Sequence, residues 1–123
     1  MTNNPYGTVK DDGTPKKEEI PGGGLRQGSN DRYDLISAVA LQRLARHYGN
    51  GAVKYVDHNW RKGITISGCI RAIMSHTVKL MMCLEDEDHA AAVAWNAFAI
   101  IETLERIKTG SLPAELDDRW KPE

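Results

Sequence analysis

Residues 66–84 read ISGCIRAIMSHTVKLMMCL, and this stretch decides the fold class of the chain. Apolar side chains recur along it at the i, i+3, i+4, i+7 spacing of one helix face. The face is made up of Ile66, Cys69, Ile70, Ile73, Met74, Thr77, Leu80, Met81 and Leu84. The spacing predicts one long α-helix with a broad buried stripe.

We expect one further helix on each side of this one. A helix that begins at Asp88 and ends before Gly110 has an apolar face of its own. That face consists of Val93, Ala97, Ile100, Ile101, Leu104 and Ile107. On the N-terminal side, the spacing predicts a helix over residues 34–48, which the run Gly49-Asn50-Gly51 ends. No alternating stretch is long enough for a strand, so we predict an all-α bundle whose second and third helices form an antiparallel hairpin.

The sequence predicts one helical domain between two tails. Residues 1–31 carry three prolines and a Gly-Gly-Gly run among mixed charges, which is typical of a flexible N-terminal arm. Residues 32–110 are expected to form the helical domain, and residues 111–123 a C-terminal tail in which Trp120 docks onto a neighbour. Three helices, two of them with broad apolar faces, leave surface that one small subunit does not cover. We therefore expect oligomerisation to complete the bundle, as a homodimer or a dimer of dimers.

Composition and charge exclude several classes of function. The formal net charge of −1 over 123 residues argues against a general nucleic-acid binder, which carries a basic surplus. No run of 18 apolar residues is present to span a membrane, and the polar N-terminus lacks the apolar core of a signal peptide. Cys69 and Cys83 would lie about 21 Å apart along one helix, beyond disulfide reach. These features predict a cytoplasmic protein with reduced core thiols and no membrane or nucleic-acid partner.

The segment 54–62 crowds cations, aromatic rings and an amide into nine residues. Its candidate ligand-binding residues are Lys54, Tyr55, Asn59, Trp60, Arg61 and Lys62. Cationic side chains bind phosphate and aromatic faces stack on a base, so this mixture is typical of a site for a phosphorylated ring compound. The alternative is a solvated loop that Trp60 anchors to the core.

The order of four motifs resembles a phage and bacterial family described as dATP/dGTP diphosphohydrolase-like. Its members read R-[FY]-D-L-I-P, G-A-x-K-Y-G, N-W-x-K-G and H-L-x-H-A-x-W-N-A in this order. The chain has RYDLI at 32–36, GAVKY at 51–55, NWRKG at 59–63, and His89 followed by AWNA at 94–97. The resemblance implies a relative of the all-α MazG-like NTP pyrophosphohydrolases, whose bundles a partner subunit completes. It also implies a nucleotide as ligand and a phage protein that acts inside its host.

The resemblance gives the acidic turn at residues 85–89 a possible chemical role. Cleavage of a triphosphate between its α and β phosphates generally needs Mg²⁺ or Mn²⁺, which carboxylate oxygens hold. We expect Glu85, Asp88 and His76 to bind the metal, and Glu85, Asp88 or His89 to activate water. A buried Asn96 on the next helix would contact the substrate. The alternatives are a helix cap and first turn for the acids, and a hydrogen-bonded packing role for His76.

Departures from the family pattern leave three functions open. Ser75 replaces an Arg, Val56 a Gly, Ser37 a Pro and Ala92 the second His, and the MazG-like E-E-x-x-E signature is absent. The first function is a metal-dependent pyrophosphohydrolase that converts a purine dNTP to its monophosphate and pyrophosphate. The second is a binding protein that sequesters a nucleotide or nucleotide-like signal without turnover. The third is a structural protein that keeps only the scaffold.

Overall fold

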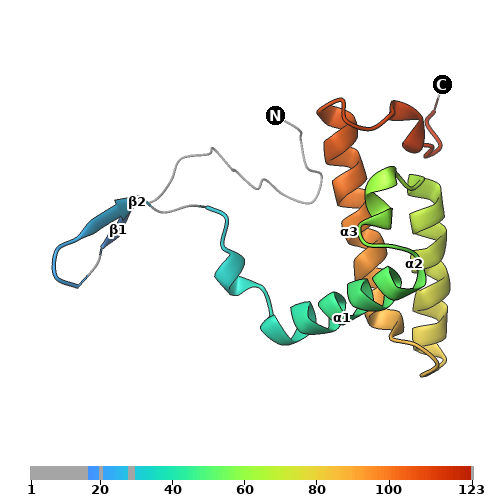
Figure 1. Cartoon of the computed structure of the whole chain (residues 1–123), viewed down its shortest axis with the longest axis horizontal. Coiled ribbons are helices and arrows are strands. Elements are labelled where there is room, and N and C mark those ends of the chain that lie inside the picture. The colour runs from blue at the N-terminus through green and yellow to red at the C-terminus, as the bar shows by residue number, and fades with distance from the viewer. Residues whose placement is uncertain (1–16, 20, 28–29, 123) are drawn as a thin grey trace. The chain divides into compact units, whose positions relative to one another are not determined.

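The computed structural model describes residues 17–19, 21–27 and 30–122. The chain divides into two compact units, Met1–Ser37 and Ala38–Glu123. The second unit holds the three main helices, so the predicted all-α class is confirmed (Figure 1).

The first unit contains a short antiparallel ribbon. Strand β1 (Lys17–Glu19) pairs with β2 (Leu25–Gln27), with Glu18 opposite Arg26. Gly22 and Gly23 lie in the turn between them with φ of 101° and 81°, a left-handed conformation that glycine adopts without strain. Three-residue strands are too short for an alternating pattern, which is why the sequence analysis did not predict them. The flexibility expected of residues 1–31 stays a prediction, and residues 1–16 lie outside the described residues.

The first helix of the second unit differs from its prediction. Helix α1 spans Ala38–Lys54, and a separate 3₁₀ turn, η1 (Tyr33–Leu35), precedes it. The predicted end at residues 49–51 is wrong, because Gly49 and Gly51 are helical and Tyr55 N–H still donates to the Gly51 carbonyl at 2.8 Å. Glycine costs about 1 kcal/mol in a helix relative to alanine, which weakens a helix without necessarily ending it.

Helices α2 (Ile66–Met81) and α3 (His89–Lys108) form the predicted antiparallel hairpin, and α1 packs across α3 (Figure 1). Each helix of the hairpin has a side-chain cap. Thr65 accepts from Gly68 N–H at the start of α2, and Asp88 accepts from Ala91 N–H at the start of α3. Small side chains line the buried side of α3, where Ala91, Ala92 and Ala99 let the neighbouring helices approach closely.

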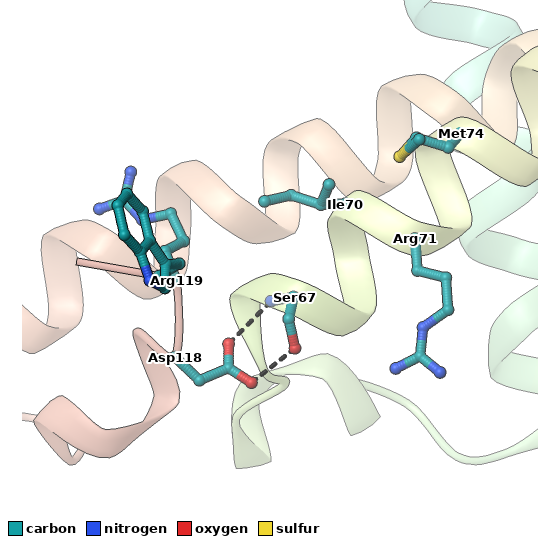
Figure 2. A pocket seen from close by; sticks show the side chains of 7 residues that line it. Ser67, Ile70, Arg71, Met74, Asp118 and Arg119 are labelled. Atoms are coloured by element: carbon teal, nitrogen blue, oxygen red, sulfur yellow. Dashed lines mark hydrogen bonds between the residues drawn. The ribbon is translucent and has the colours of Figure 1, made fainter. Parts of the chain in front are cut away.

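The C-terminal tail packs back on the start of α2. The tail contains the 3₁₀ turn η3 (Ala114–Leu116). Leu116 of this turn lies next to Gly63, the residue that follows the short helix η2 (Asn59–Lys62). Asp118 accepts hydrogen bonds from Ser67 N–H at 2.8 Å and from Ser67 Oγ–H at 2.5 Å (Figure 2). The tail therefore closes the N-terminal end of α2.

The two cysteines have different surroundings. Cys69 is buried in the core as expected, but Cys83 is exposed and lies beyond the end of α2, with φ of 57°. The expectation that both are core thiols in one helix is thus wrong for Cys83, because the helix ends at Met81.

No helix among the described residues is long and apolar enough to cross a membrane.

Several large apolar side chains remain exposed on the hairpin. Met81 is 78% exposed and Met74 65% on α2, and Ile101 is 60% exposed on α3. These side chains agree with a surface that a second subunit covers, but the homodimer stays a prediction.

Candidate metal centre

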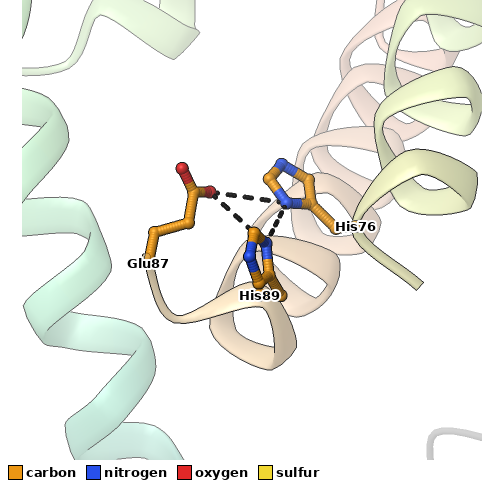
Figure 3. A group of neighbouring side chains, drawn as sticks. All are labelled: His76, Glu87 and His89. Atoms are coloured by element: carbon orange, nitrogen blue, oxygen red, sulfur yellow. Dashed lines mark hydrogen bonds and ion pairs between the residues drawn. The ribbon is translucent and has the colours of Figure 1, made fainter. Parts of the chain in front are cut away.

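Two histidines meet where the hairpin reverses. His76 lies in the C-terminal half of α2, and His89 is the first residue of α3. Because residues 82–88 turn the chain back on itself, the two imidazoles face one another with Nδ1 atoms 2.9 Å apart (Figure 3). The His89 side chain is fully buried and that of His76 is 19% exposed.

Glu87 completes a group of three potential metal ligands. Its Oε1 lies 3.4 Å from His76 Nδ1 and 3.9 Å from His89 Nδ1 (Figure 3). Within the part of the chain that the structure describes, this is the only set of three His, Cys, Asp or Glu side chains close enough to share one ion. Glu87 is half exposed, so the group is open to solvent on that side.

Asp86 fixes the tautomer of His89. Its Oδ1 lies 2.7 Å from His89 Nε2, and this hydrogen bond is the main reason that the pKa of Asp86 is lowered. An ionised carboxylate only accepts hydrogen bonds, so Nε2 of His89 carries the proton and donates it. In the neutral ring Nδ1 is then an unprotonated nitrogen, which faces His76 and Glu87.

Burial favours the neutral form of His76. Burial is the largest influence and lowers the pKa of His76, while Glu87 opposes this by raising it. When both rings are neutral, His89 Nδ1 accepts, and the short contact between the rings is a hydrogen bond that His76 Nδ1–H donates. Neutral imidazole is the form that binds metals.

Asp88 is engaged elsewhere than expected. Its carboxylate accepts two hydrogen bonds from Arg43 of α1, at 2.6 and 2.9 Å, and also caps α3. The Arg43 guanidinium, followed by the Ala91 N–H, lowers the pKa of Asp88 to about 2. The structure therefore places Asp88 in the capping role that the sequence analysis held as the alternative, and groups His76 with Glu87 and His89. Glu85 is exposed and lies outside that group.

Asn96 is buried, but its amide is satisfied within its own helix. Its Nδ2 donates to the Ala92 carbonyl at 2.8 Å. Among the described residues, no buried side-chain nitrogen or oxygen lacks a hydrogen-bond partner. Because the Asn96 amide already has a partner, its burial does not require a ligand, and its contact with substrate stays a prediction.

The segment 54–62 packs near the other end of α3. The ring of Trp60 lies 6.3 Å, edge-on, from that of Tyr48, and the Arg61 guanidinium stands 5.3 Å from the Trp60 ring centre. Arg106 Nη1 donates to the Arg61 carbonyl at 2.9 Å. Seventeen residues separate His89 from Arg106, which is about 25 Å along a helix. The Arg61 backbone is therefore far from the histidine pair within one subunit.

The remaining residues of this segment are more exposed. Lys54 is the last residue of α1, and its Nζ lies 5.5 Å from the ring centre of Tyr55, which is exposed. Asn59 begins η2 and is half buried, and Lys62 ends it on the surface. The structure brings these residues together with each other and not with the metal-ligand group.

Three rings lie between the two regions. Trp95 of α3 is 6.3 Å from His47 and 6.1 Å from Tyr48, both on α1. His47 lies close enough to His76 and Asp88 to lower the pKa of each. The sequence alone did not indicate a role in the candidate site for His47, Trp95, Arg43, Asp86 or Glu87. The AWNA motif contains Trp95 and was a usable signal, as was the spacing of Arg43 and His47 on one helix face.

A hollow of about 330 Å³ lies apart from these groups, between α2 and the tail (Figure 2). Its lining residues are Ser67, Ile70, Arg71, Met74, Asp118, Arg119 and Trp120. Trp120 is 87% exposed, so its docking onto a neighbour stays a prediction.

The fold and the site define an all-α domain whose antiparallel helices bring two histidines and a glutamate to one point beside an arginine–aspartate pair. The chain belongs to the family described as dATP/dGTP diphosphohydrolase, N-terminal, whose model matches residues 21–112. The resemblance in the motifs is thereby confirmed. The description refers to the N-terminal region of such proteins, so membership establishes the family of this domain. No curated protein and no solved structure matches the chain significantly.

Proposed function

We propose that this protein binds a purine deoxynucleoside triphosphate and hydrolyses it, with a divalent metal ion, to the monophosphate and pyrophosphate. The observation that carries the proposal is the group His76, Glu87 and His89. It is found in a chain whose family is described as dATP/dGTP diphosphohydrolase, N-terminal. In the reaction, a water oxygen bonds to the α phosphorus and the bond from that phosphorus to the bridging oxygen breaks. Pyrophosphate leaves, and the proton of water passes to a base or to solvent.

His76, Glu87 and His89 would hold the ion. When bound there, a divalent ion neutralises phosphate charge and lowers the pKa of its water. Mg²⁺ and Mn²⁺ are the ions expected from the family resemblance. Glu85, on the exposed side of the turn, is the acid that we assign to water activation, since Asp88 is paired with Arg43.

Arg43 is the cation best placed to bind a phosphate near the ion. Asp88 engages its Nε and Nη2 and leaves the N–H groups on Nη1 for a ligand. We assign the base of the nucleotide to the rings of Tyr48, Trp95 and Trp60. Trp95 is six residues from His89, about 9 Å along α3, so a nucleotide would run from the metal group toward these rings. Lys54, Arg61 and Lys62 would then contact the nucleotide only at its distant end.

A second function, nucleotide binding without turnover, has one observation in its favour. Ala92 is buried one helical turn after His89, at the position where the family pattern has a second histidine. Relative to the family pattern, this chain therefore lacks one histidine on the buried face of α3, while the aromatic rings are retained. Sequestration of a nucleotide or a nucleotide-like signal needs the rings and cations but no activated water.

Mass spectrometry of a mixed NTP and dNTP pool tests turnover. The protein is incubated with Mg²⁺, with Mn²⁺ or with a chelator, and a His76→Ala, Glu87→Gln double variant serves as the comparison. One monophosphate with pyrophosphate should form with metal only, and the double variant should lose it. An unchanged pool together with a nucleotide that co-purifies would support the binding protein instead.

We also propose that the subunit forms a homodimer or a dimer of dimers through exposed apolar faces such as that of Met74 and Met81. Light scattering coupled to size exclusion measures the mass directly. A monomer at micromolar concentration would contradict this assembly.

A further inference from the structure

We infer that His76, Glu87 and His89 form a site for a first-row transition-metal ion such as Zn²⁺, Co²⁺ or Mn²⁺ in preference to Mg²⁺, with Asp86 as a positioning residue. The inference specifies the metal of the proposed active site, but it rests on ligand geometry and can hold even if the chain has no turnover.

The first argument is the size of the ligand triangle. The three distances between ligand atoms are 2.9, 3.4 and 3.9 Å. The point equidistant from three atoms so placed lies about 2.0 Å from each of them, close to the bond lengths of zinc to histidine nitrogen and carboxylate oxygen. A four-coordinate ion with such bonds has ligand atoms about 3.4 Å apart, near the middle of the observed range.

The second argument is the chemistry of the donors. Two of the three donor atoms are imidazole nitrogens, which suit zinc, copper, iron and nickel. Mg²⁺ takes oxygen ligands and keeps several of its waters, so a site with one carboxylate and two nitrogens suits it poorly. Affinity for nitrogen and oxygen sites rises along the first-row series from Mn²⁺ toward Cu²⁺, and Zn²⁺ lies near its upper end.

The third argument is the support behind His89. Metal-bound histidines almost always donate their other N–H to a carboxylate or carbonyl, which fixes the ring and strengthens the ligand. His89 does this through Nε2 to Asp86 at 2.7 Å, and its ring is fully buried. His76 needs one adjustment, because its proton must move from Nδ1 to Nε2 when an ion replaces the hydrogen bond between the rings.

The fourth argument is the open side of the site. Three protein ligands leave coordination positions free, as in catalytic zinc sites and unlike structural sites with four protein ligands. Glu87 is half exposed, so those positions face solvent where water or a phosphate oxygen can enter.

Direct metal binding, measured without nucleotide, tests the inference. The untagged protein is stripped with chelator, checked for helicity by circular dichroism, and titrated by calorimetry with Co²⁺, Zn²⁺, Mn²⁺ and Mg²⁺. Cobalt also gives visible absorption bands that report its ligands. We expect one ion per subunit, cobalt bands typical of nitrogen and oxygen ligands, and Zn²⁺ and Co²⁺ bound at least 100-fold more tightly than Mg²⁺.

Variants identify the ligands. His76→Ala and Glu87→Gln change partly exposed residues, and each should weaken Co²⁺ binding at least tenfold. Asp86→Asn should weaken it about 10–100-fold, the usual effect of losing such a supporting carboxylate, while the cobalt bands persist. Glu105→Gln removes an exposed carboxylate near the other end of α3 and should change little.

Two results would overturn the inference: Mg²⁺ bound as tightly as Co²⁺, or Co²⁺ binding that survives both His76→Ala and Glu87→Gln. Its failure is distinguishable from failure of the proposed function. Tight Co²⁺ binding without any nucleotide turnover removes the enzyme and leaves the site. Turnover with Mg²⁺ and no measurable Co²⁺ or Zn²⁺ binding removes the site and leaves the enzyme.

Discussion

The turn between α2 and α3 and the segment 54–62 both gather charged and aromatic side chains, but they use them differently. At the turn, His89 is fully buried, and potential ligand atoms of His76 and Glu87 converge on it. In the segment, Trp60 and Arg61 pack on each other and on the scaffold, and Lys54 lies beside Tyr55. A high density of charged and aromatic side chains in the sequence is thus a weaker guide to a site than the convergence of their polar atoms in a buried place.

The largest effect is expected at the turn, from His89→Ala. The change removes a buried ring and leaves Asp86 and His76 without their hydrogen-bond partner. We expect the free energy of unfolding to fall by about 3 kcal/mol. Urea unfolding followed by circular dichroism measures it. Glu85→Ala, an exposed neighbour, should stay within about 0.5 kcal/mol of the wild type. Equal losses in the two variants would contradict the burial argument.

Trp60→Ala tests the other region. If the ring stacks on the base, nucleotide affinity should fall by roughly 1–3 kcal/mol, the range for base–aromatic stacking. Calorimetric titration with dGTP and dATP measures this, after the variant is shown to be folded. Trp95→Ala is the matched change next to the metal group. Loss of binding in the Trp60 variant alone would place the ligand site at the segment 54–62 instead of beside the metal group.

Two glycines that flank the segment 54–62 should change the stability in opposite directions when each is replaced by alanine. Gly63 has φ of 102°, and an added Cβ would lie 2.7 Å from Leu116 Cδ1, whereas Gly51 is helical with open space around it. Gly63→Ala should destabilise by about 1–3 kcal/mol through backbone strain. Gly51→Ala should stabilise by about 0.4–1 kcal/mol. Thermal unfolding of the two variants compares them, and destabilisation by Gly51→Ala would show that this part of α1 is not helical.

Asp88→Asn distinguishes a cap from a metal ligand. Asparagine is as good a helix N-cap as aspartate, so only the ion pair with Arg43 is lost. We expect Co²⁺ affinity to change by less than about threefold, against at least tenfold for Glu87→Gln. A drop as large as that of Glu87→Gln would return Asp88 to the metal group.

The smallest effect is a pH dependence in the tail, away from both regions. Hydrogen bonds from Ser67, side chain first and then backbone, lower the pKa of Asp118. Because the pKa of Asp118 is lower in the folded state, its carboxylate stabilises the fold fully above the unfolded pKa of about 3.9. This stabilisation is lost as the pH falls from there through the lower folded pKa. The difference in stability between wild type and Asp118→Ala should thus shrink when unfolding is repeated at pH 3 instead of pH 7. A constant difference would show that ionisation of Asp118 plays no part.

Helical periodicity predicted α2 and α3 well, because each carries a continuous apolar face. It could not predict the extension of α1 through Gly49 and Gly51, since packing and hydrogen bonds outweigh the low helix propensity of glycine. His76 and His89 were recognised as site candidates, but Glu87 was not. It lies in an irregular turn, where no repeating spacing shows which way a side chain points. The partner of Asp88 could not be found either, because Arg43 is 45 residues away in the sequence.

The closeness of His76 and His89 in the sequence, only 13 residues apart, has a consequence for folding kinetics. Their meeting closes a short loop, and such local contacts form early because little chain entropy is lost. An ion that binds this pair can therefore act on the hairpin before α1 and the tail have docked. Bound metal should accelerate refolding of the chain as well as slow its unfolding.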